Sequence, residues 1–259
     1  MTGSLSFTWW GHASTTVELD GVRVAVDPLL VDRLLHLRRY AVSPAPRAAV
    51  ADVVLISHPH ADHCHLPSLR LFDRGTTVVA PPGAAELVGR LGFEHVVVAV
   101  PGAGLRLATS QDTTIEVEVL GATHDGRRLP LPRATGTAVG FRVAAAGRSF
   151  WFPGDTGLRE DMWDVDPVDL ALAPVGGWGP TLGAGHMDPV EAAEAVDRVG
   201  ADWAVPVHWG TFWPVGLGRV DRRRHQHLFV TPGQRFTEAV GDASRTVLPA
   251  PGERVELHG

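Results

Sequence analysis

Four histidines and one aspartate stand within eight positions of the segment ISHPHADHCH, residues 56–65. The overlapping run ADVVLIS, residues 51–57, is short and apolar, and it predicts a buried strand. Pro59 disfavours a helix that begins directly after this strand. We therefore expect the histidines on a loop at the carboxyl end of a buried strand, where α/β proteins usually build their sites.

Two hairpins are the clearest local signals elsewhere in the chain. Residues 14–27, STTVELDGVRVAVD, alternate apolar and polar side chains around Asp20-Gly21, and residues 140–152, GFRVAAAGRSFWF, turn at Gly147. Short apolar runs predict five further strands, at residues 76–80, 96–100, 104–108, 114–120 and 169–174. Short helices are expected at residues 66–73 and 83–91.

Residues 188–199, DPVEAAEAVDRV, give the strongest helix prediction. The Asp188 side chain can cap the first turn, and a proline suits the position that follows. Four apolar side chains are expected to share one face of this helix. They are Val190, Ala193, Val196 and Val199.

One short pattern occurs twice. Ala51-Asp52 is followed, six positions after the aspartate, by His58, and Ala201-Asp202 is followed at the same spacing by His208. Both intervals are apolar strands, which suggests two similar βα halves that face each other. No stretch has the composition of a linker, so residues 1–259 are predicted to form a single domain.

The histidine cluster suits a divalent first-row metal ion. Residues two apart on an extended loop project to the same side, so His58 and His60 can bind one ion. Asp62 and His63 lie further along the loop and can reach a second ion beside the first. The alternative is that some of these histidines are only polar loop residues.

The cluster alone leaves each ion short of ligands, and three further candidates each follow a predicted strand. These are His124, Asp155 and His208. Gly154 and Gly157 flank the aspartate closely and let the backbone approach the site. A carboxylate can bridge two ions with its two oxygens.

HPHADH, His124, PGDTG and VHWG occur in that order, and together they resemble the motifs of the metallo-β-lactamase superfamily. The resemblance extends from Trp10-Gly11-His12 to about residue 240. It implies a four-layer αββα sandwich, an α/β fold of two pseudo-symmetric halves, with a metal site at the edge between two β-sheets. It also implies that His58, His60 and His124 hold one ion, that Asp62, His63 and His208 hold the other, and that Asp155 bridges them.

Five further segments resemble one branch of that family. They are Gly11-His12-Ala13-Ser14, Asp27-Pro28, the 124–127 stretch HDGR, the 186–189 stretch HMDP and the 208–212 stretch HWGTF. This branch contains the ascorbate-6-phosphate lactonases and the N-acylphosphatidylethanolamine-hydrolysing phospholipase D. The resemblance implies a hydrolase of a phosphodiester, a lactone or a similar ester. Its expected mechanism uses a metal-bridging hydroxide that Asp62 helps to orient. Zinc is the expected metal, with manganese or iron as alternatives.

Three other polar residues are candidates with less direct roles. His186 can contact substrate or donate a proton to the leaving group, or it can be a surface histidine before a helix. His12 and Asp27 can orient metal ligands without binding the metal themselves. Alternatively, the first is a buried histidine satisfied by backbone, and the second only terminates its strand.

The substrate pocket is expected to involve Trp178, Trp209 and Arg127, which lie in loops beside the motif residues. For the tryptophans, core or loop packing is the alternative. Cys64 is not expected to bind metal, because the other ligands are already sufficient.

Composition limits the possible partners. The net charge of −6 disfavours non-specific nucleic-acid binding, and the absence of lysine excludes Schiff-base chemistry and a P-loop lysine. No run approaches the about 20 apolar residues of a membrane span, and no secretory signal is predicted. A single cysteine fits a cytoplasmic location. The run Arg222-Arg223-Arg224 is most simply a solvated loop, and an anion contact is the alternative. No basic amphipathic helix is expected, so the membrane association of the phospholipase is not carried over to this chain.

The sequence therefore predicts an enzyme with two divalent metal ions that acts on a small-molecule or lipid-like ester. An iron-dependent oxidoreductase on the same fold is the main alternative, and a metal-binding protein without catalysis is a third. The complete ligand set disfavours both alternatives. The oligomeric state is not predicted.

Overall fold

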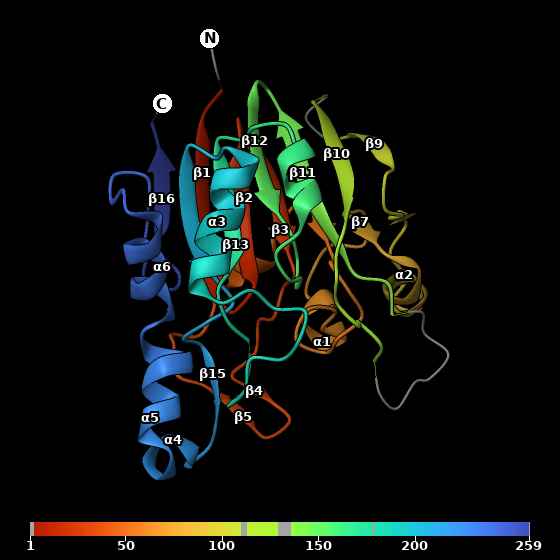
Figure 1. Ribbon diagram of the computed structural model, residues 1–259. Helices are drawn as coiled ribbons and strands as arrows, with labels where there is room; N and C mark the ends of the chain where they lie inside the picture. The colour runs from red at the N-terminus through yellow and green to blue at the C-terminus, as the bar shows by residue number, and fades with distance from the viewer. Residues whose placement is uncertain (1–2, 110–112, 129–135, 178, 259) are drawn as a thin grey trace.

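Two β-sheets lie face to face at the centre of the molecule, and helices cover their outer faces (Figure 1). This architecture is that of a computed structural model, which describes residues 3–109, 113–128, 136–177 and 179–258. The two chain ends lie at one end of the sheets, and the loop after β6 (Val53–Leu55) lies at the other.

The first sheet has seven strands and contains the loop with the histidine cluster. Four of its strands are antiparallel neighbours: β16 (Arg254–Leu257), β1 (Leu5–Gly11), β2 (Ser14–Leu19) and β3 (Val22–Val26). The order continues in parallel from β3 through β6, β7 (Thr77–Ala80) and β8 (Val96–Val98). The hairpin predicted at Asp20-Gly21 joins β2 to β3 and is confirmed.

The second sheet has six strands. Its parallel part consists of β14 (Trp203–Val207), β13 (Leu170–Pro174) and β12 (Arg148–Phe152). It continues in antiparallel order through β11 (Val139–Ala145), β10 (Thr114–Gly121) and β9 (Gly104–Ala108). The second predicted hairpin, β11–β12, is confirmed.

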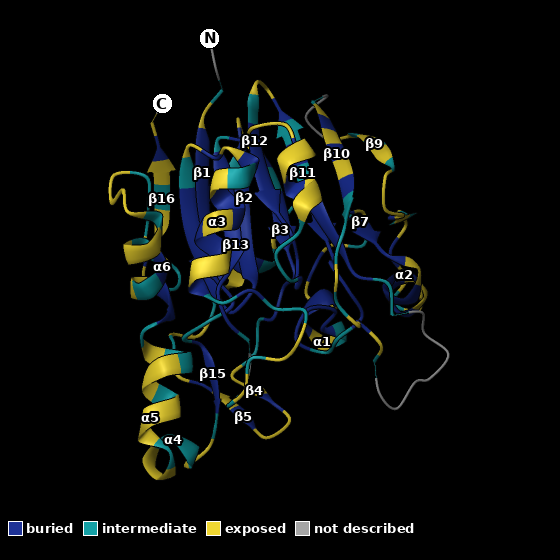
Figure 2. Cartoon of the chain, viewed as in Figure 1, coloured by how far each residue is buried: buried dark blue, intermediate teal, exposed yellow. Residues whose placement is uncertain are grey.

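Alternation along the central strands places their side chains in different layers, because successive residues of a strand point to opposite faces. In β13, Leu170 and Leu172 enter the core between the sheets, whereas Ala171 and Ala173 pack under helices. Figure 2 shows this division as buried strands beneath partly exposed helices.

The helices on the first sheet are α1 (Leu66–Leu69) and α2 (Pro82–Gly89), and those on the second are α3 (Pro189–Val199) and α6 (Pro232–Val240). Two short 3₁₀ turns, η1 (Pro46–Ala49) and η2 (Glu160–Asp164), complete the connections. The predicted α/β fold, a four-layer αββα sandwich, is confirmed.

Helix α3 has the predicted cap. The Asp188 carboxylate accepts hydrogen bonds from the backbone N–H of Val190 and Glu191, and the Glu191 carboxylate accepts one from the N–H of Asp188. The expectation that Val190 is on the buried face is wrong, because that side chain is exposed. A step of three residues falls about 60° short of a full helical turn, so Val190 is rotated by about 120° from the buried Val196.

The repeated pattern corresponds to equivalent strands in the two sheets. Strand β6 leads to His58 and β14 leads to His208, and each strand lies in the parallel part of its own sheet. The two histidines therefore approach the same edge of the sandwich from opposite sheets.

A small third sheet and a helical segment project beyond this edge. The sheet consists of β4 (Arg33–Leu34), β5 (Leu37–Arg39) and β15 (Phe212–Pro214), and the helical segment of α4 (Leu217–Val220), α5 (Arg222–His225) and the π-helical turn η3 (Gln226–Val230). The expectation of a loop for Arg222-Arg223-Arg224 is wrong, because these residues belong to α5, a helix of four residues. Across the described ranges, we find no helix with the length and apolar character needed to cross a membrane.

Candidate metal centre

The loop after β6 folds back on itself. The backbone N–H groups of His63 and Cys64 donate to the carbonyl of His60, at 3.2 and 2.8 Å. Arg128 Nη1 donates to the carbonyls of Pro59 and Cys64, at 3.2 and 2.7 Å. One guanidinium therefore links the two ends of the segment that carries the clustered ligands.

Three ring nitrogens form the first group of converging atoms. Nδ1 of His60 lies 3.0 Å from Nε2 of His58 and 3.2 Å from Nε2 of His124. The Nδ1 of His124 donates to the carbonyl of Gly185 at 3.2 Å, so its Nε2 presents a lone pair to the group. One proton on His60 Nδ1 cannot hydrogen-bond to the lone pairs of both neighbouring nitrogens, whereas one cation can bind the lone pairs of all three nitrogens. The donor set therefore fits a metal ion.

Ser57 and Asp27 determine which nitrogen of two other rings faces the site. Ser57 Oγ donates its hydrogen to Asp27 Oδ2 at 2.5 Å, and it therefore accepts a hydrogen bond from the N–H of His58 Nδ1 at 3.0 Å. The same Asp27 oxygen accepts from His63 Nδ1 at 2.7 Å, and Asp27 Oδ1 accepts from the Ser57 N–H at 2.8 Å. The Nε2 atoms of both histidines are left free to bind metal, an arrangement typical of metal sites.

The second group consists of Asp62, His63 and His208. The Nε2 atoms of the two histidines are 3.0 Å apart, and Asp62 Oδ2 lies 3.5 Å from that of His63 and 3.9 Å from that of His208. All three side chains are buried. They come from the loop after β6 and from the end of β14, so both halves of the sandwich contribute.

Asp155 lies between the two groups. Its Oδ2 is 3.2 Å from His63 Nε2 and 3.8 Å from His58 Nε2, and its Oδ1 is 3.4 Å from His208 Nε2. This Oδ1 is buried and has no hydrogen-bond partner within the described ranges, as expected of an oxygen that binds a cation. Gly154 permits the approach, since it has a φ of +63° and a Cβ there would lie 2.7 Å from a carbonyl oxygen.

The local charges favour the ligand forms of most of these groups. Burial and the neighbouring imidazole of His63 lower the pKa of His58 well below its usual value. Burial would raise the pKa of Asp155, but His208 and His63 outweigh it and lower that pKa well below its usual value. His63 is the exception: burial lowers its pKa, but the surrounding carboxylates raise it well above the usual value.

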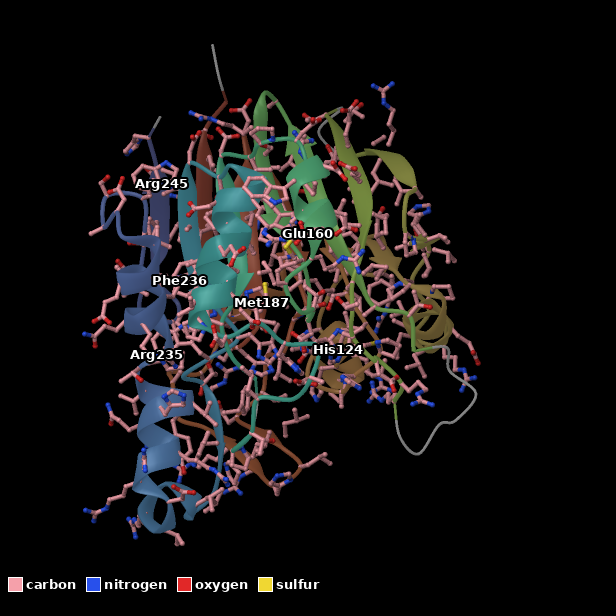
Figure 3. All side chains as sticks on the ribbon, viewed as in Figure 1. His124, Glu160, Met187, Arg235, Phe236 and Arg245 are labelled. Carbon is pink, nitrogen blue, oxygen red and sulfur yellow. The ribbon has the colours of Figure 1, made fainter. Side chains whose placement is uncertain are left out.

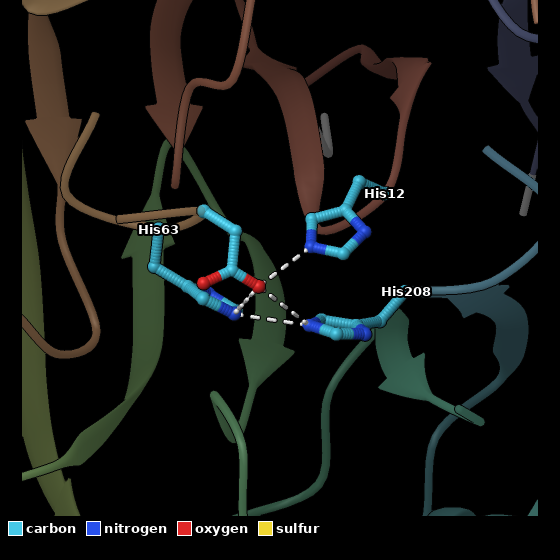
Figure 4. A group of neighbouring side chains, drawn as sticks. His12, His63 and His208 are labelled. Carbon is cyan, nitrogen blue, oxygen red and sulfur yellow. Dashed lines mark hydrogen bonds and ion pairs between the residues drawn. The ribbon is translucent and has the colours of Figure 1, made fainter. Parts of the chain in front are cut away.

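His12 links two of the candidate ligands. Its Nε2 lies 2.9 Å from Asp62 Oδ2, and its ring lies 4.0 Å from the ring of His208 (Figure 4). The carbonyl of His12 accepts hydrogen bonds from the His208 N–H at 2.7 Å and from the Trp9 indole at 2.8 Å. The sequence indicates His12 as a residue that can orient a metal ligand, and the structure places His12 beside the candidate ligand Asp62.

His186 approaches the site from the loop before α3. Its Nδ1 donates to the Gly183 carbonyl at 3.2 Å, and its Nε2 lies 3.2 Å from Asp155 Oδ2. Burial alone would lower the pKa of His186, but the Asp155 carboxylate raises it by more, so this pKa lies above its usual value. His124, labelled in Figure 3, has its ring 4.8 Å from that of His186. The side chain is thus close to both groups of candidate ligands.

A pocket of about 260 Å³ opens beside His60 and Asp62. One wall is the β4–β5 hairpin, and its other walls include Arg127 and Arg128. Arg127, a candidate for substrate contact, lines this pocket and pairs with Asp125 at 2.5 Å on the surface. The apolar lining residues of the hairpin are Leu34, Leu35 and Leu37.

The two tryptophans proposed for the pocket have different outcomes. Trp209 stacks on Trp9, with ring centroids 5.7 Å apart, and its indole donates to the Pro206 carbonyl at 3.0 Å. It packs against the cores of the sandwich rather than against the pocket. Trp178 lies outside the described residues.

Sequence reasoning missed several contributors to the site. Ser57, Arg128 and the hairpin leucines stand in no motif, and only the folded chain brings them together. The one available signal was the position of Ser57 directly before the histidine cluster, at the end of a buried strand.

Comparison with known proteins agrees with this architecture. Residues 22–209 match the family profile described as "Beta-lactamase superfamily domain". A UPF0173 metal-dependent hydrolase of Methanopyrus kandleri is 30% identical, over 97% of this chain and 100% of that protein. An N-acyl-phosphatidylethanolamine-hydrolyzing phospholipase D of Caenorhabditis elegans is 27% identical, over 81% of this chain and 64% of that protein.

The fold is also similar to solved structures. Igni18, a metallo hydrolase from Ignicoccus hospitalis, superposes with a TM-score of 0.71 at 22% identity. The alignment covers 99% of each chain. The whole described fold therefore has a counterpart in that structure.

Proposed function

The chain belongs to the beta-lactamase superfamily and is a metal-dependent hydrolase, and from that premise we propose that its site holds two divalent ions and cleaves a phosphodiester, a lactone or a similar ester. The observation that carries the proposal is the position of Asp155. Its two oxygens face different sets of ring nitrogens, and one of these oxygens is buried without a hydrogen bond. We further propose that the chain acts as one domain, because both halves supply ligands.

The charge of the site supports the number of ions. Asp27, Asp62 and Asp155 are buried, and their ion-pair partners within the described part of the chain are all histidines. Buried charges are costly unless they are compensated. With neutral imidazoles the three carboxylates carry −3, one divalent ion leaves −1, and two leave +1. The hydroxide that such ions would supply adds −1, so two ions bring the site to a net charge of 0, whereas one ion would leave −2.

The proposed ligands are those predicted from the sequence: His58, His60 and His124 on one ion, Asp62, His63 and His208 on the other, and Asp155 on both. Zinc suits the imidazole and carboxylate donors, as do manganese and iron. When bound, two such ions supply a Lewis acid for the substrate oxygen and a water whose pKa is lowered toward neutrality.

The chain's own residues orient the reaction. Asp62 is held by His12 and helps to direct the attacking oxygen. His186, with its Nε2 directed at Asp155 beside both groups of ligands, is placed to carry a proton and to give it to the leaving group. The pocket beside His60 offers an apolar wall and Arg127 to the rest of a small-molecule or lipid-like ester.

The test combines metal content with hydrolysis. Purified protein is analysed for zinc, manganese and iron, and is assayed on bis-p-nitrophenyl phosphate, lactones and lipid phosphodiesters. We expect two ions per chain, and loss of hydrolysis in Asp62→Ala and His208→Ala. The exposed His95 gives a matched control, and His95→Ala should retain full activity. One iron per chain with oxygen consumption and no hydrolysis would instead favour the oxidoreductase.

The role of His186 has its own measurement. General-acid catalysis typically contributes about 10²- to 10⁴-fold, and only for leaving groups that need a proton. His186→Ala should therefore lower kcat strongly on alkyl esters and weakly on p-nitrophenyl esters. Equal losses on both substrates would contradict the proton transfer and leave the hydrolase assignment intact.

A further inference from the structure

The small third sheet and the helical segment that follows it form a lobe, which we define as residues 31–42 and 212–230. Strand β15 pairs with β5, so the two stretches are joined although they are far apart in the sequence. The lobe projects from the edge of the sandwich at which the candidate metal centre lies (Figure 1).

The charge of the lobe is opposite to that of the chain. It contains seven arginines and two aspartates, which gives +5, whereas the whole chain carries −6. One of these arginines, Arg39, is buried. The other six are exposed: Arg33, Arg38, Arg219, Arg222, Arg223 and Arg224.

The lobe also carries the most exposed large apolar side chains of the described chain. Leu35, at the turn of the β4–β5 hairpin, is 88% exposed, and Val220, at the end of α4, is 85% exposed. Four more large apolar side chains of the lobe are exposed: Tyr40, Val42, Val215 and Val230. Single exposed apolar residues are normal, but this concentration in a small basic lobe is not.

Buried contacts hold these exposed side chains in place. The Arg39 guanidinium donates to the carbonyls of Trp10, Leu29 and Val31, and lies 4.8 Å from the ring centroid of Phe212. The hairpin and β15 are therefore fixed to the sandwich, and the exposure of Leu35 is part of the fold.

A similar anchor supports the helical side of the lobe. The ring of His225 stacks on Phe229 with centroids 4.8 Å apart, and both rings contact Trp213. These contacts occupy the inner face of α5 and η3. The arginines of α5 consequently face solvent.

We propose that this lobe docks the protein onto a surface of anionic lipid. Leu35 and Val220 enter the apolar layer, and the surrounding arginines contact the headgroup phosphates. A symmetric contact between the lobes of two copies is a poorer alternative, because two lobes of +5 repel each other. A nucleic acid would match the arginines but would leave the apolar tips exposed to water.

The same hairpin links the docking surface to the pocket. Leu35, at its tip, lines the rim of the pocket together with Leu34 and Leu37. Docking through the tip therefore brings the pocket mouth close to the lipid surface. The inference concerns binding alone, and it holds whether or not the bond cleaved at the site is the one proposed above.

Co-sedimentation with vesicles tests the proposal. The full chain is mixed with vesicles of phosphatidylcholine alone or with 30 mol% phosphatidylglycerol (about one lipid in three), in low and high salt. We expect binding only to the anionic vesicles, and weaker binding in high salt. Each arginine near an anionic surface contributes about 1 kcal/mol, so the triple variant R222Q/R223Q/R224Q should bind about 100-fold more weakly. Leu35→Ser and Val220→Ser should each weaken binding by about tenfold.

Matched variants away from the lobe serve as controls. R70Q/R90Q/R106Q removes three exposed arginines of the body, and Leu71→Ser removes an exposed apolar side chain. Neither should change vesicle binding, and all variants should keep the far-UV circular dichroism of the parent. Binding that is absent, or equal in the lobe and control variants, overturns the proposal. A dimer in solution that Leu35→Ser dissociates, or tighter binding to single-stranded DNA than to the vesicles, would overturn it also.

Discussion

Asp27 makes no contact with the proposed substrate pocket, yet it should control metal affinity. Its Oδ2 accepts hydrogen bonds from His63 Nδ1 and from Ser57 Oγ, and that hydroxyl in turn accepts from His58 Nδ1. One carboxylate therefore orients a ring in each of the two ligand groups. In Asp27→Asn, an NH₂ group takes the place of one of the two oxygens. Either the position of Oδ2 no longer accepts from His63 and Ser57 Oγ, or the position of Oδ1 no longer accepts from the Ser57 N–H.

The size of the effect follows from these contacts. Loss of a partner that orients a metal-binding histidine typically lowers metal affinity by about 10- to 100-fold. The two histidines share this partner, so we expect a loss near the upper value, or about 2.7 kcal/mol. Asparagine is preferred to alanine, because Asp27 has a φ of +40° and asparagine tolerates that conformation well.

Competition with a chromophoric chelator measures the affinity, and thermal unfolding of metal-free protein measures the fold. Asp32→Asn is the matched control, since Asp32 is an exposed carboxylate in the following loop that bonds Ser43. The control should bind metal like the parent. If Asp27→Asn also binds both ions with the parent's affinity, the orienting role assigned to Asp27 is refuted.

Three other outcomes are expected. Arg128→Leu should lower metal affinity by about tenfold, because it removes the guanidinium hydrogen bonds to both ends of the ligand loop. Arg127→Leu is the control and should leave metal affinity unchanged. Chelator competition compares the two variants. Metal binding should release about one proton per chain at neutral pH, because the carboxylates raise the pKa of His63 well above its usual value and the ion requires the neutral ring. Metal affinity should therefore rise with pH up to that raised pKa. Titration calorimetry in buffers of different ionisation enthalpy measures the number of protons released. A heat of binding that is independent of the buffer would contradict this proton release. Burial raises the pKa of Cys64 to about 12, so iodoacetamide should label this thiol only after unfolding, and fast labelling of native protein would contradict its assigned burial.

Local patterns predicted the elements whose causes are local. The hairpins β2–β3 and β11–β12 follow from alternation around turn residues, and α3 follows from a capping aspartate and the proline after it. The small sheet was not predictable in this way. Its strands have two or three residues, and β15 pairs with β5 across more than half of the chain. Such pairing is determined by the packing of the whole sandwich.

The same distinction applies to the site. The candidate ligands could be found from the sequence because metal chemistry restricts the residue types and places them after buried strands. The residues that orient the ligands are common types without a pattern. Ser57 is one of many serines and Arg128 one of many arginines, and their roles depend on which atoms the fold places within about 3 Å of them.

The orienting contacts also indicate how the chain prepares the site before an ion arrives. The outer nitrogens of His58, His63 and His124 each donate to an acceptor of the chain, which directs the inner nitrogens at the site. The inner nitrogens of His58 and His124 are lone pairs, whereas that of His63 carries the proton that metal binding releases. His208 differs, because its Nδ1 is buried without a hydrogen-bond partner in the described ranges. Its ring is held instead by contact with the tilted ring of His12, at 4.0 Å between centroids, and by the hydrogen bond from its backbone N–H to the His12 carbonyl. Since His12 also bonds Asp62, one residue outside the ligand set orients two of the three ligands of the second group, and so links their positions to the turn between β1 and β2.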